Sequence, residues 1–116
     1  MSCLFNSLSY FIKDTSFNIR QRICDYLQQN KPILDGLETH EILKFESSDY
    51  ISSMRSTSTW GGAIEIQAAC NIWNVRINVS NYRDRTQKII EFIPIHGVIQ
   101  DTICIYWTGG HYEPIK

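Results

Sequence analysis

The apolar residues of this chain change their spacing near Asn74, and this change constrains the fold more than any other feature. In the segment 19–27 apolar side chains recur every four residues, which is the spacing of a helix face. In the segment 75–79 they alternate with polar ones, which is the period of a half-buried strand. Helices first and strands afterwards predict an α+β domain, in which helices pack on a small sheet.

Local signals set the bounds of the expected helices. The apolar segment 3–12 predicts a buried helix. Residues 14–16 offer N-caps to a second helix, which ends near Asn30 before Lys31-Pro32. The segment 36–56 indicates one or two short helices, and the polar run 56–59 indicates a loop. Gly61-Gly62 then allows a tight turn into the last helix.

The strands follow this last helix. We expect them over 75–79, 88–93, 102–107 and 111–115, with a connection at 82–85 and a tight turn at 108–110. The predicted sheet is mostly antiparallel and packs against the helix that begins at Cys3. Such packing brings residues 3 and 111 together although they lie at opposite ends of the sequence.

Composition limits the classes of function. With 116 residues and 43% hydrophobic residues, the chain predicts one domain, residues 1–116, with one core. A net charge of -1 gives no footprint for nucleic acid, and the pairs Arg20/Arg22 and Arg83/Arg85 are expected to lie on solvated faces. No window approaches the roughly 18 apolar residues that cross a membrane, and the start lacks the basic region of a secretory signal.

The chain has four cysteines, Cys3, Cys24, Cys70 and Cys104. They form no CxxC pair and no Cys/His cluster with metal-ligand spacing, so we expect no metal and no cofactor. Four cysteines without a disulfide framework indicate a reducing compartment. Cys24, Cys70 and Cys104 lie in apolar periodic segments and are expected to be small buried hydrophobes. Cys3 stands where a helix begins, and the partial positive charge of a helix start favours a thiolate.

A thiol nucleophile needs a base, and the chain has three histidines. His40 lies in an acidic helical stretch and His96 in a turn that leaves a strand, so we expect surface and structural roles for them. His111 follows a double glycine and precedes Glu113 by two residues, which places both on one face of a strand. The carboxylate can then reach one imidazole nitrogen while the other faces a thiol. The alternative is that Glu113 is a solvent-facing residue before Pro114.

Four sequence blocks resemble, in order, the signature blocks of the ovarian-tumour (OTU) family of cysteine proteases. They are Cys3-Leu4-Phe5-Asn6-Ser7-Leu8-Ser9, Trp60-Gly61-Gly62-Ala63-Ile64-Glu65-Ile66-Gln67-Ala68-Ala69, Val75-Arg76-Ile77-Asn78-Val79 and Gly110-His111-Tyr112-Glu113. The resemblance covers essentially the whole chain. It implies a papain-like OTU fold and a deubiquitinase that hydrolyses the peptide or isopeptide bond after the C-terminal glycine of ubiquitin or a ubiquitin-like modifier.

The resemblance also implies roles for individual residues. Cys3 is the nucleophile, His111 is the general base, and Glu113 stands where the family usually carries Asp or Asn. The family's cysteine is normally preceded by an Asp-Gly-x turn that helps to form the oxyanion hole, whereas Met1 and Ser2 precede it here. The backbone amides of Ser2 and Cys3 then form the hole, or the chain is a trimmed domain, or the enzyme is attenuated.

Aromatic and glycine residues beside the candidate site predict how a substrate binds. Trp60 and Trp107 flank glycines, and each is able to form a wall of a narrow channel for an extended Gly-Gly tail. With Gly61, Gly110 and Tyr112 they make up the predicted substrate-binding set. The alternative, which weighs about equally, is that both tryptophans pack at the edge of the sheet.

The leading function is therefore a thiol-dependent deubiquitinase whose partner is ubiquitin or polyubiquitin. The alternatives are a catalytically weak or inactive ubiquitin-binding module of the same fold, and a thiol hydrolase of small amides. We expect a monomer in the cytoplasm. The chain holds eighteen isoleucines, which is typical of an AT-rich genome, such as that of a large DNA virus, a bacterial symbiont or a protist. For a viral protein the compartment is the host cytosol.

Overall fold

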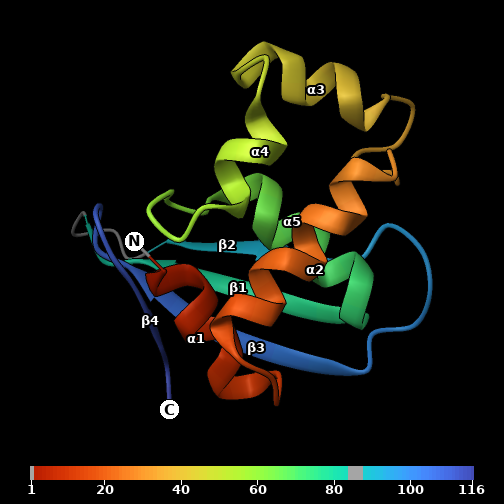
Figure 1. Cartoon of the computed structure of the whole chain (residues 1–116). Helices are drawn as coiled ribbons and strands as arrows, with labels where there is room; N and C mark the ends of the chain where they lie inside the picture. Colours follow the sequence, from red (N-terminus) through yellow and green to blue (C-terminus); the bar gives the residue numbers. More distant parts are fainter. Residues whose placement is uncertain (1, 84–87) are drawn as a thin grey trace.

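The computed structural model describes residues 2–83 and 88–116, and within them five helices precede four strands (Figure 1). The helices are α1 (Cys3–Phe11), α2 (Ser16–Gln28), α3 (Thr39–Glu46), α4 (Tyr50–Arg55) and α5 (Ala63–Trp73). The strands are β1 (Val75–Asn81), β2 (Ile89–Phe92), β3 (Asp101–Trp107) and β4 (Tyr112–Pro114). The α+β prediction is confirmed. The connection predicted at 82–85 includes Asp84 and Arg85, which lie outside the described residues.

The four strands form one sheet in the order β2-β1-β3-β4. β1 pairs antiparallel with β2, and β3 pairs antiparallel with β4, as predicted. The central pair, β1 with β3, is parallel, with Ile77 opposite Ile103. The sheet is therefore mixed, because the chain returns from β2 to the far side of β1 before it begins β3.

The helices cover one face of the sheet. α1 packs against β4 and β3, α5 packs against β1 and β2, and α2 lies across both helices, whereas α3 contacts only other helices (Figure 1). The covered face carries the buried side chains of alternate strand residues, namely Val75, Ile77, Val79, Ile103 and Ile105. The helical core beneath it includes Phe5, Leu8, Ile19, Ile23 and Ile66.

Two predictions about individual side chains are wrong. Cys104 is only half-buried, because it alternates with the buried Ile103 and Ile105 and so points to the other face of the sheet. Arg20 is 1% exposed and not solvated, because its long side chain reaches from α2 into the space between α1 and α4. Its neighbour Arg22 is exposed as expected.

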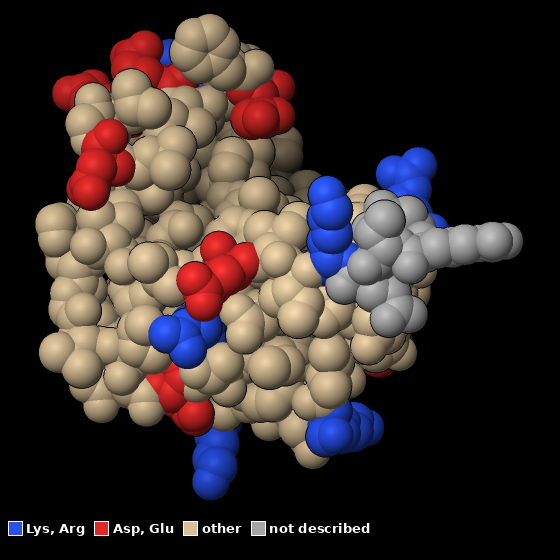
Figure 2. Space-filling model, turned by 180° about the vertical axis from the view of Figure 1, so that it is seen from behind, with Lys and Arg blue, Asp and Glu red and all other residues tan. Residues whose placement is uncertain are grey.

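Charged side chains are unevenly spread over the face seen from behind (Figure 2). Acidic side chains gather around α3, where the sequence places Glu38, Glu41, Glu46 and Asp49, whereas acidic and basic side chains are mixed over the rest of this face. Within the described residues, none of the helices is long and apolar enough to cross a membrane.

Candidate active site

Cys3 is the first residue of α1 and is 7% exposed. The first turn of the helix holds its backbone on both sides: the Asn6 N–H donates to the Ser2 carbonyl at 2.7 Å, and the Ser7 hydroxyl donates to the Cys3 carbonyl at 2.8 Å. Because Cys3 opens the helix, its own N–H has no acceptor inside the helix. The structure thus places the thiol and a backbone N–H group that is not bonded within the helix together at the positive end of α1.

His111 follows a turn and stands immediately before β4. The Thr108 N–H donates to the His111 carbonyl at 3.0 Å and closes this turn, and Gly109 within it has a φ of 105°, which favours glycine. Nε2 of His111 lies 2.5 Å from Oε1 of Glu113, while about half of each side chain remains exposed, 51% and 45%. The predicted contact between the imidazole and the carboxylate is present. It leaves Nδ1 as the ring nitrogen that can exchange a proton with a thiol.

The two ends of the chain meet in one pocket of about 340 Å³ between α1 and β4. Cys3, His111, Glu113 and Tyr112 all line it, so the structure brings together the three predicted catalytic residues and one predicted substrate-binding residue. Burial raises the pKa of the Tyr112 hydroxyl, and negative charge on Cys3 and Glu65 adds to this effect. The catalytic roles stay predictions, but the residues share the space in which the reaction would occur.

The other predicted substrate-binding residues are not among those that line this pocket. Gly61 packs against α1 so closely that a Cβ atom there would lie 2.7 Å from Cδ2 of Leu4. Trp60 is half-exposed and, with Gly61, lines a separate pocket of about 370 Å³. Gly110 is exposed in the turn before His111.

Trp107 is half-buried and packs against the core of the domain. The Arg83 guanidinium lies over its indole ring at 5.9 Å from the ring centroid. The position of Trp107 thus fits the edge-packing alternative at least as well as a channel wall.

Sequence reasoning missed several polar residues that line the pocket of Cys3 and His111. They are Asn6, Ser9, Tyr10 and Lys116. Asn6 and Tyr10 follow Cys3 by three and seven residues, which places all three on one face of a helix. This spacing from the candidate nucleophile could have identified Asn6 and Tyr10 from the sequence.

The remaining cysteines differ from Cys3 in their surroundings. Cys24 and Cys70 are 0% exposed, as expected of small core residues. Burial raises the pKa of Cys24 to about 11 and that of Cys70 to about 12. Both thiols are therefore neutral near pH 7 and are poor nucleophiles. Within residues 2–83 and 88–116, no three His, Cys, Asp or Glu side chains are grouped so that they could hold a metal ion.

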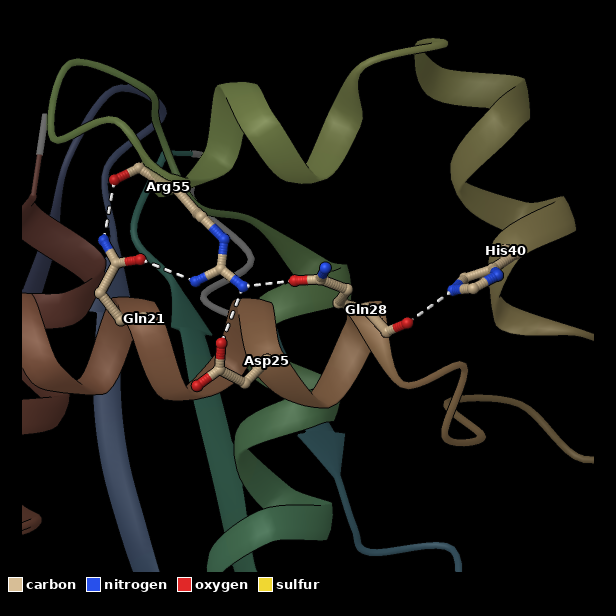
Figure 3. A network of polar contacts seen from close by, with 5 residues as sticks. All are labelled: Gln21, Asp25, Gln28, His40 and Arg55. Carbon is tan, nitrogen blue, oxygen red and sulfur yellow. Dashed lines mark hydrogen bonds and ion pairs between the residues drawn. The ribbon is translucent and has the colours of Figure 1, made fainter.

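The other two histidines lie away from this pocket. His40 is exposed on α3, and its Nε2 lies 3.0 Å from the Gln28 carbonyl at the end of α2 (Figure 3). His96 is exposed in the connection between β2 and β3. The predicted surface position of His40 is confirmed, whereas the structural role expected for His96 stays a prediction.

Comparisons with known proteins place these residues in a family. The chain is 28% identical over 130 residues to ubiquitin thioesterase otu2 of Schizosaccharomyces pombe, a match that covers 98% of this chain and 42% of that protein. It is 29% identical over 120 residues to ubiquitin thioesterase OTU1 of Mus musculus, covering 99% of this chain and 33% of that protein. The chain thus spans less than half the length of these relatives.

The fold agrees with the sequence matches. A solved structure of an ovarian tumour (OTU) domain in complex with ubiquitin matches with a TM-score of 0.75 and 28% identity, over 97% of this chain and 62% of that one. The predicted OTU fold is confirmed. The family model of OTU-like cysteine proteases matches residues 2–112, a segment that contains Cys3 and His111 and ends one residue before Glu113. The chain belongs to the family of OTU-like cysteine proteases.

Proposed function

We propose that this chain is a cysteine-type deubiquitinase, which hydrolyses the peptide or isopeptide bond after the C-terminal glycine of ubiquitin or a ubiquitin-like modifier. The observation that carries the proposal is the pocket in which Cys3 meets His111, whose imidazole is held by Glu113. Membership of the family and the names of the two ubiquitin thioesterases support the choice of substrate. So does the relative that was solved in complex with ubiquitin.

The geometry supports a two-step acyl transfer. Nδ1 of His111 takes the thiol proton, and the Cys3 sulfur attacks the carbonyl carbon of the terminal glycine. The resulting oxyanion accepts hydrogen bonds from the backbone N–H groups of Ser2 and Cys3 at the start of α1. The intermediate collapses to a thioester while His111 gives the proton to the leaving amine. A water molecule, deprotonated by His111, then hydrolyses the thioester and restores the thiol. Glu113 orients the imidazole and stabilises its charged form.

The extended tail of ubiquitin would approach the site between two loops. Trp60 and Gly61 lie on one side of α1, and Gly110 and Tyr112 lie beside His111. We assign these residues and Trp107 to tail binding. Glycine is the residue type that a narrow passage of this kind would admit next to the scissile bond.

Substitution of the nucleophile and the base tests the function. Cys3→Ala should abolish cleavage of a fluorogenic ubiquitin substrate and labelling by a ubiquitin probe with a C-terminal electrophile. His111→Ala should lower kcat by about two or more orders of magnitude, whereas His96→Ala, an exposed control, should have wild-type kinetics. Probe labelling that persists in Cys3→Ala refutes the assignment. If the wild-type protein binds ubiquitin but turns over none, the chain is a binding module of the same fold.

Glu113 is tested by a matched pair of variants. Glu113→Gln keeps the side-chain length but loses the charge that orients His111, so kcat should fall clearly while the affinity for ubiquitin stays unchanged. Glu113→Asp restores the length that the family usually carries and should keep substantial activity. Wild-type kinetics in Glu113→Gln would mean that the site works as a Cys–His dyad.

We place the protein in the cytosol as a monomer, and its four free cysteines support a reducing compartment. A viral source, suggested by the isoleucine content alone, stays a prediction, since the two relatives named above come from a fission yeast and a mouse.

A further inference from the structure

Two buried charged side chains lie beneath the first turn of α1, and the proposed mechanism uses neither. Arg20 on α2 and Glu65 on α5 are each 1% exposed. Removing an ion from water costs several kcal/mol, and apolar residues of similar volume often serve stability equally well. A buried charged pair is therefore better explained by what it positions than by what it adds to stability.

The Arg20 guanidinium contacts the backbone segment on either side of the nucleophile. Its Nη2 donates to the Ser2 hydroxyl at 3.3 Å, immediately before Cys3, and its carbon Cζ lies 4.1 Å from the centroid of the Phe5 ring, just after it. Its Nη1 donates to the Met54 carbonyl on α4 at 2.8 Å. A planar guanidinium can make these contacts at once in a fixed geometry, which a lysine ammonium cannot do. Arg20 thus ties the start of α1 to α4.

Glu65 fixes the surface on which α1 rests. Its Oε1 accepts the Gly62 N–H at 2.7 Å, and its Oε2 accepts the Tyr50 hydroxyl at 2.5 Å. The first of these bonds holds the turn at Gly61-Gly62. Gly61 in turn lies against Leu4 and Phe5 of α1. A shift of the Glu65 carboxylate would therefore move the support of the helix that carries Cys3.

The two side chains also act on each other electrostatically. Burial raises the pKa of Glu65, and the hydrogen bonds from Tyr50 and Gly62 and the positive charge of Arg20 oppose this rise. Burial lowers the pKa of Arg20, and the negative charge of Glu65 opposes this fall. Each ion is thus stabilised in part by the other.

We propose that Arg20 and Glu65 are positioning residues that hold the first turn of α1 from two sides, and so fix the Cys3 thiol and the Ser2 and Cys3 amides relative to His111. Neither side chain touches the substrate. The proposal rests on the proposed function, because the reaction is what requires this placement.

Two pairs of variants test the proposal. Arg20→Met removes the guanidinium and keeps an apolar side chain, and Arg22→Met is its control on the exposed side of the same helix. Glu65→Leu removes both acceptors, and Glu65→Gln keeps an oxygen for the Gly62 N–H and an amide that can bond to Tyr50. For each variant we would measure the melting temperature, kcat and KM with fluorogenic ubiquitin, and the rate of Cys3 alkylation by iodoacetamide, followed by peptide mass spectrometry.

Positioning predicts a specific pattern. Arg20→Met and Glu65→Leu should lower kcat by about 10- to 100-fold, with KM nearly unchanged and with slower Cys3 alkylation. Arg22→Met and Glu65→Gln should stay near the wild type. Folded Arg20→Met and Glu65→Leu proteins with wild-type kcat and wild-type Cys3 alkylation would overturn the proposal, since a merely structural role changes only the melting temperature.

A milder variant keeps the proposal testable if Arg20→Met and Glu65→Leu fail to fold. Ser2→Ala removes the half-exposed hydroxyl that accepts from Arg20 at 3.3 Å and that donates to the Thr57 carbonyl at the longer distance of 3.5 Å. Loss of the shorter bond should lower kcat by about two- to tenfold, the equivalent of one hydrogen bond. A wild-type kcat in Ser2→Ala would then reject the Arg20 contact. The alkylation rate needs no ubiquitin, so a wild-type protein that is alkylated at Cys3 but cleaves no ubiquitin would refute the proposed function and still allow positioning to be measured.

Discussion

Gly61→Ala should destabilise the domain through one contact, that between the Trp60–Gly62 turn and α1. A Cβ atom at Gly61 would lie 2.7 Å from Cδ2 of Leu4 and 3.0 Å from Cε2 and Cζ of Phe5. Leu4 is 1% and Phe5 0% exposed, so neither can swing into solvent. Overpacking a core in this way costs about 1–3 kcal/mol. The entropy of unfolding is about 2.1 cal/mol/K per residue, which for 116 residues makes the expected fall in Tm about 4–12 °C.

Thermal unfolding followed by circular dichroism measures this fall, and Gly62→Ser is the matched control. A Cβ atom at Gly62 would meet no atom within 4 Å, and serine is a favoured N-cap for α5, so this variant should melt within about 2 °C of the wild type. Gly61 does not have a positive φ, so alanine adds no backbone strain there. Because α1 must shift to admit the new atom, kcat should fall as well. A Gly61→Ala protein with the same Tm as the Gly62→Ser protein would refute the packing argument.

Three further predictions concern residues outside the catalytic pocket. At pH 8 iodoacetamide should leave Cys24 and Cys70 unmodified in the folded protein. Their pKa values of about 11 and 12 mean that only about one Cys24 side chain in a thousand and one Cys70 side chain in ten thousand is a thiolate at this pH. Peptide mass spectrometry measures the modification, and alkylation of either cysteine would contradict the prediction. The raised pKa of Glu65 means that the folded state keeps its proton longer than the unfolded state, so the contribution of Glu65 to stability falls as the pH rises from about 4.5 through the raised pKa. The difference in unfolding free energy, Glu65→Gln minus wild type, should therefore grow with pH over this window in urea titrations, and a constant difference would count against the burial of an ionised carboxylate. Arg55→Ala should lower the unfolding free energy by about 1–3 kcal/mol, because it removes the partly exposed ion pair with Asp25 and two hydrogen bonds to Gln21 and Gln28. High salt should reduce only the ion-pair part of this loss, and a loss that salt does not change would contradict this.

Most elements of the fold could be predicted because each depends on local spacing. The expected helix at 3–12 is α1, Cys3–Phe11, and the strand expected at 102–107 is β3, Asp101–Trp107. The pairing of strands depends on which strand the chain returns to, and periodicity carries no information about that. For this reason the parallel pairing of β1 with β3 was not predicted.

The parts of the candidate site that depend on local spacing could also be predicted from the sequence. The contact of His111 with Glu113 follows from a separation of two residues in an extended segment, although His111 itself precedes β4. The buried charges of Arg20 and Glu65 could not be found in this way, because a pattern of apolar spacing assigns every charged residue to solvent. The hydrogen-bond partners Ser2 and Met54 of Arg20 and Tyr50 of Glu65 lie 18, 34 and 15 residues away in sequence, and they help to explain why these charges are buried.

Two arginines join α2 and α4, and they should affect the proposed activity in different ways. Arg55 on α4 bonds to Gln21, Asp25 and Gln28, all on α2, at distances between 2.7 and 2.9 Å (Figure 3). Its contacts hold two helices together, but none of these three partners lies on α1. Arg20 makes the corresponding link from α2 to Met54 and also reaches Ser2 and Phe5. Well below the melting temperature, Arg55→Ala should therefore keep the wild-type kcat. The kcat of Arg20→Met should fall at the same temperature by more than its loss of stability can explain. Equal loss of kcat in both variants would mean that the rate follows the general rigidity of the helices, and not the placement of the first turn of α1.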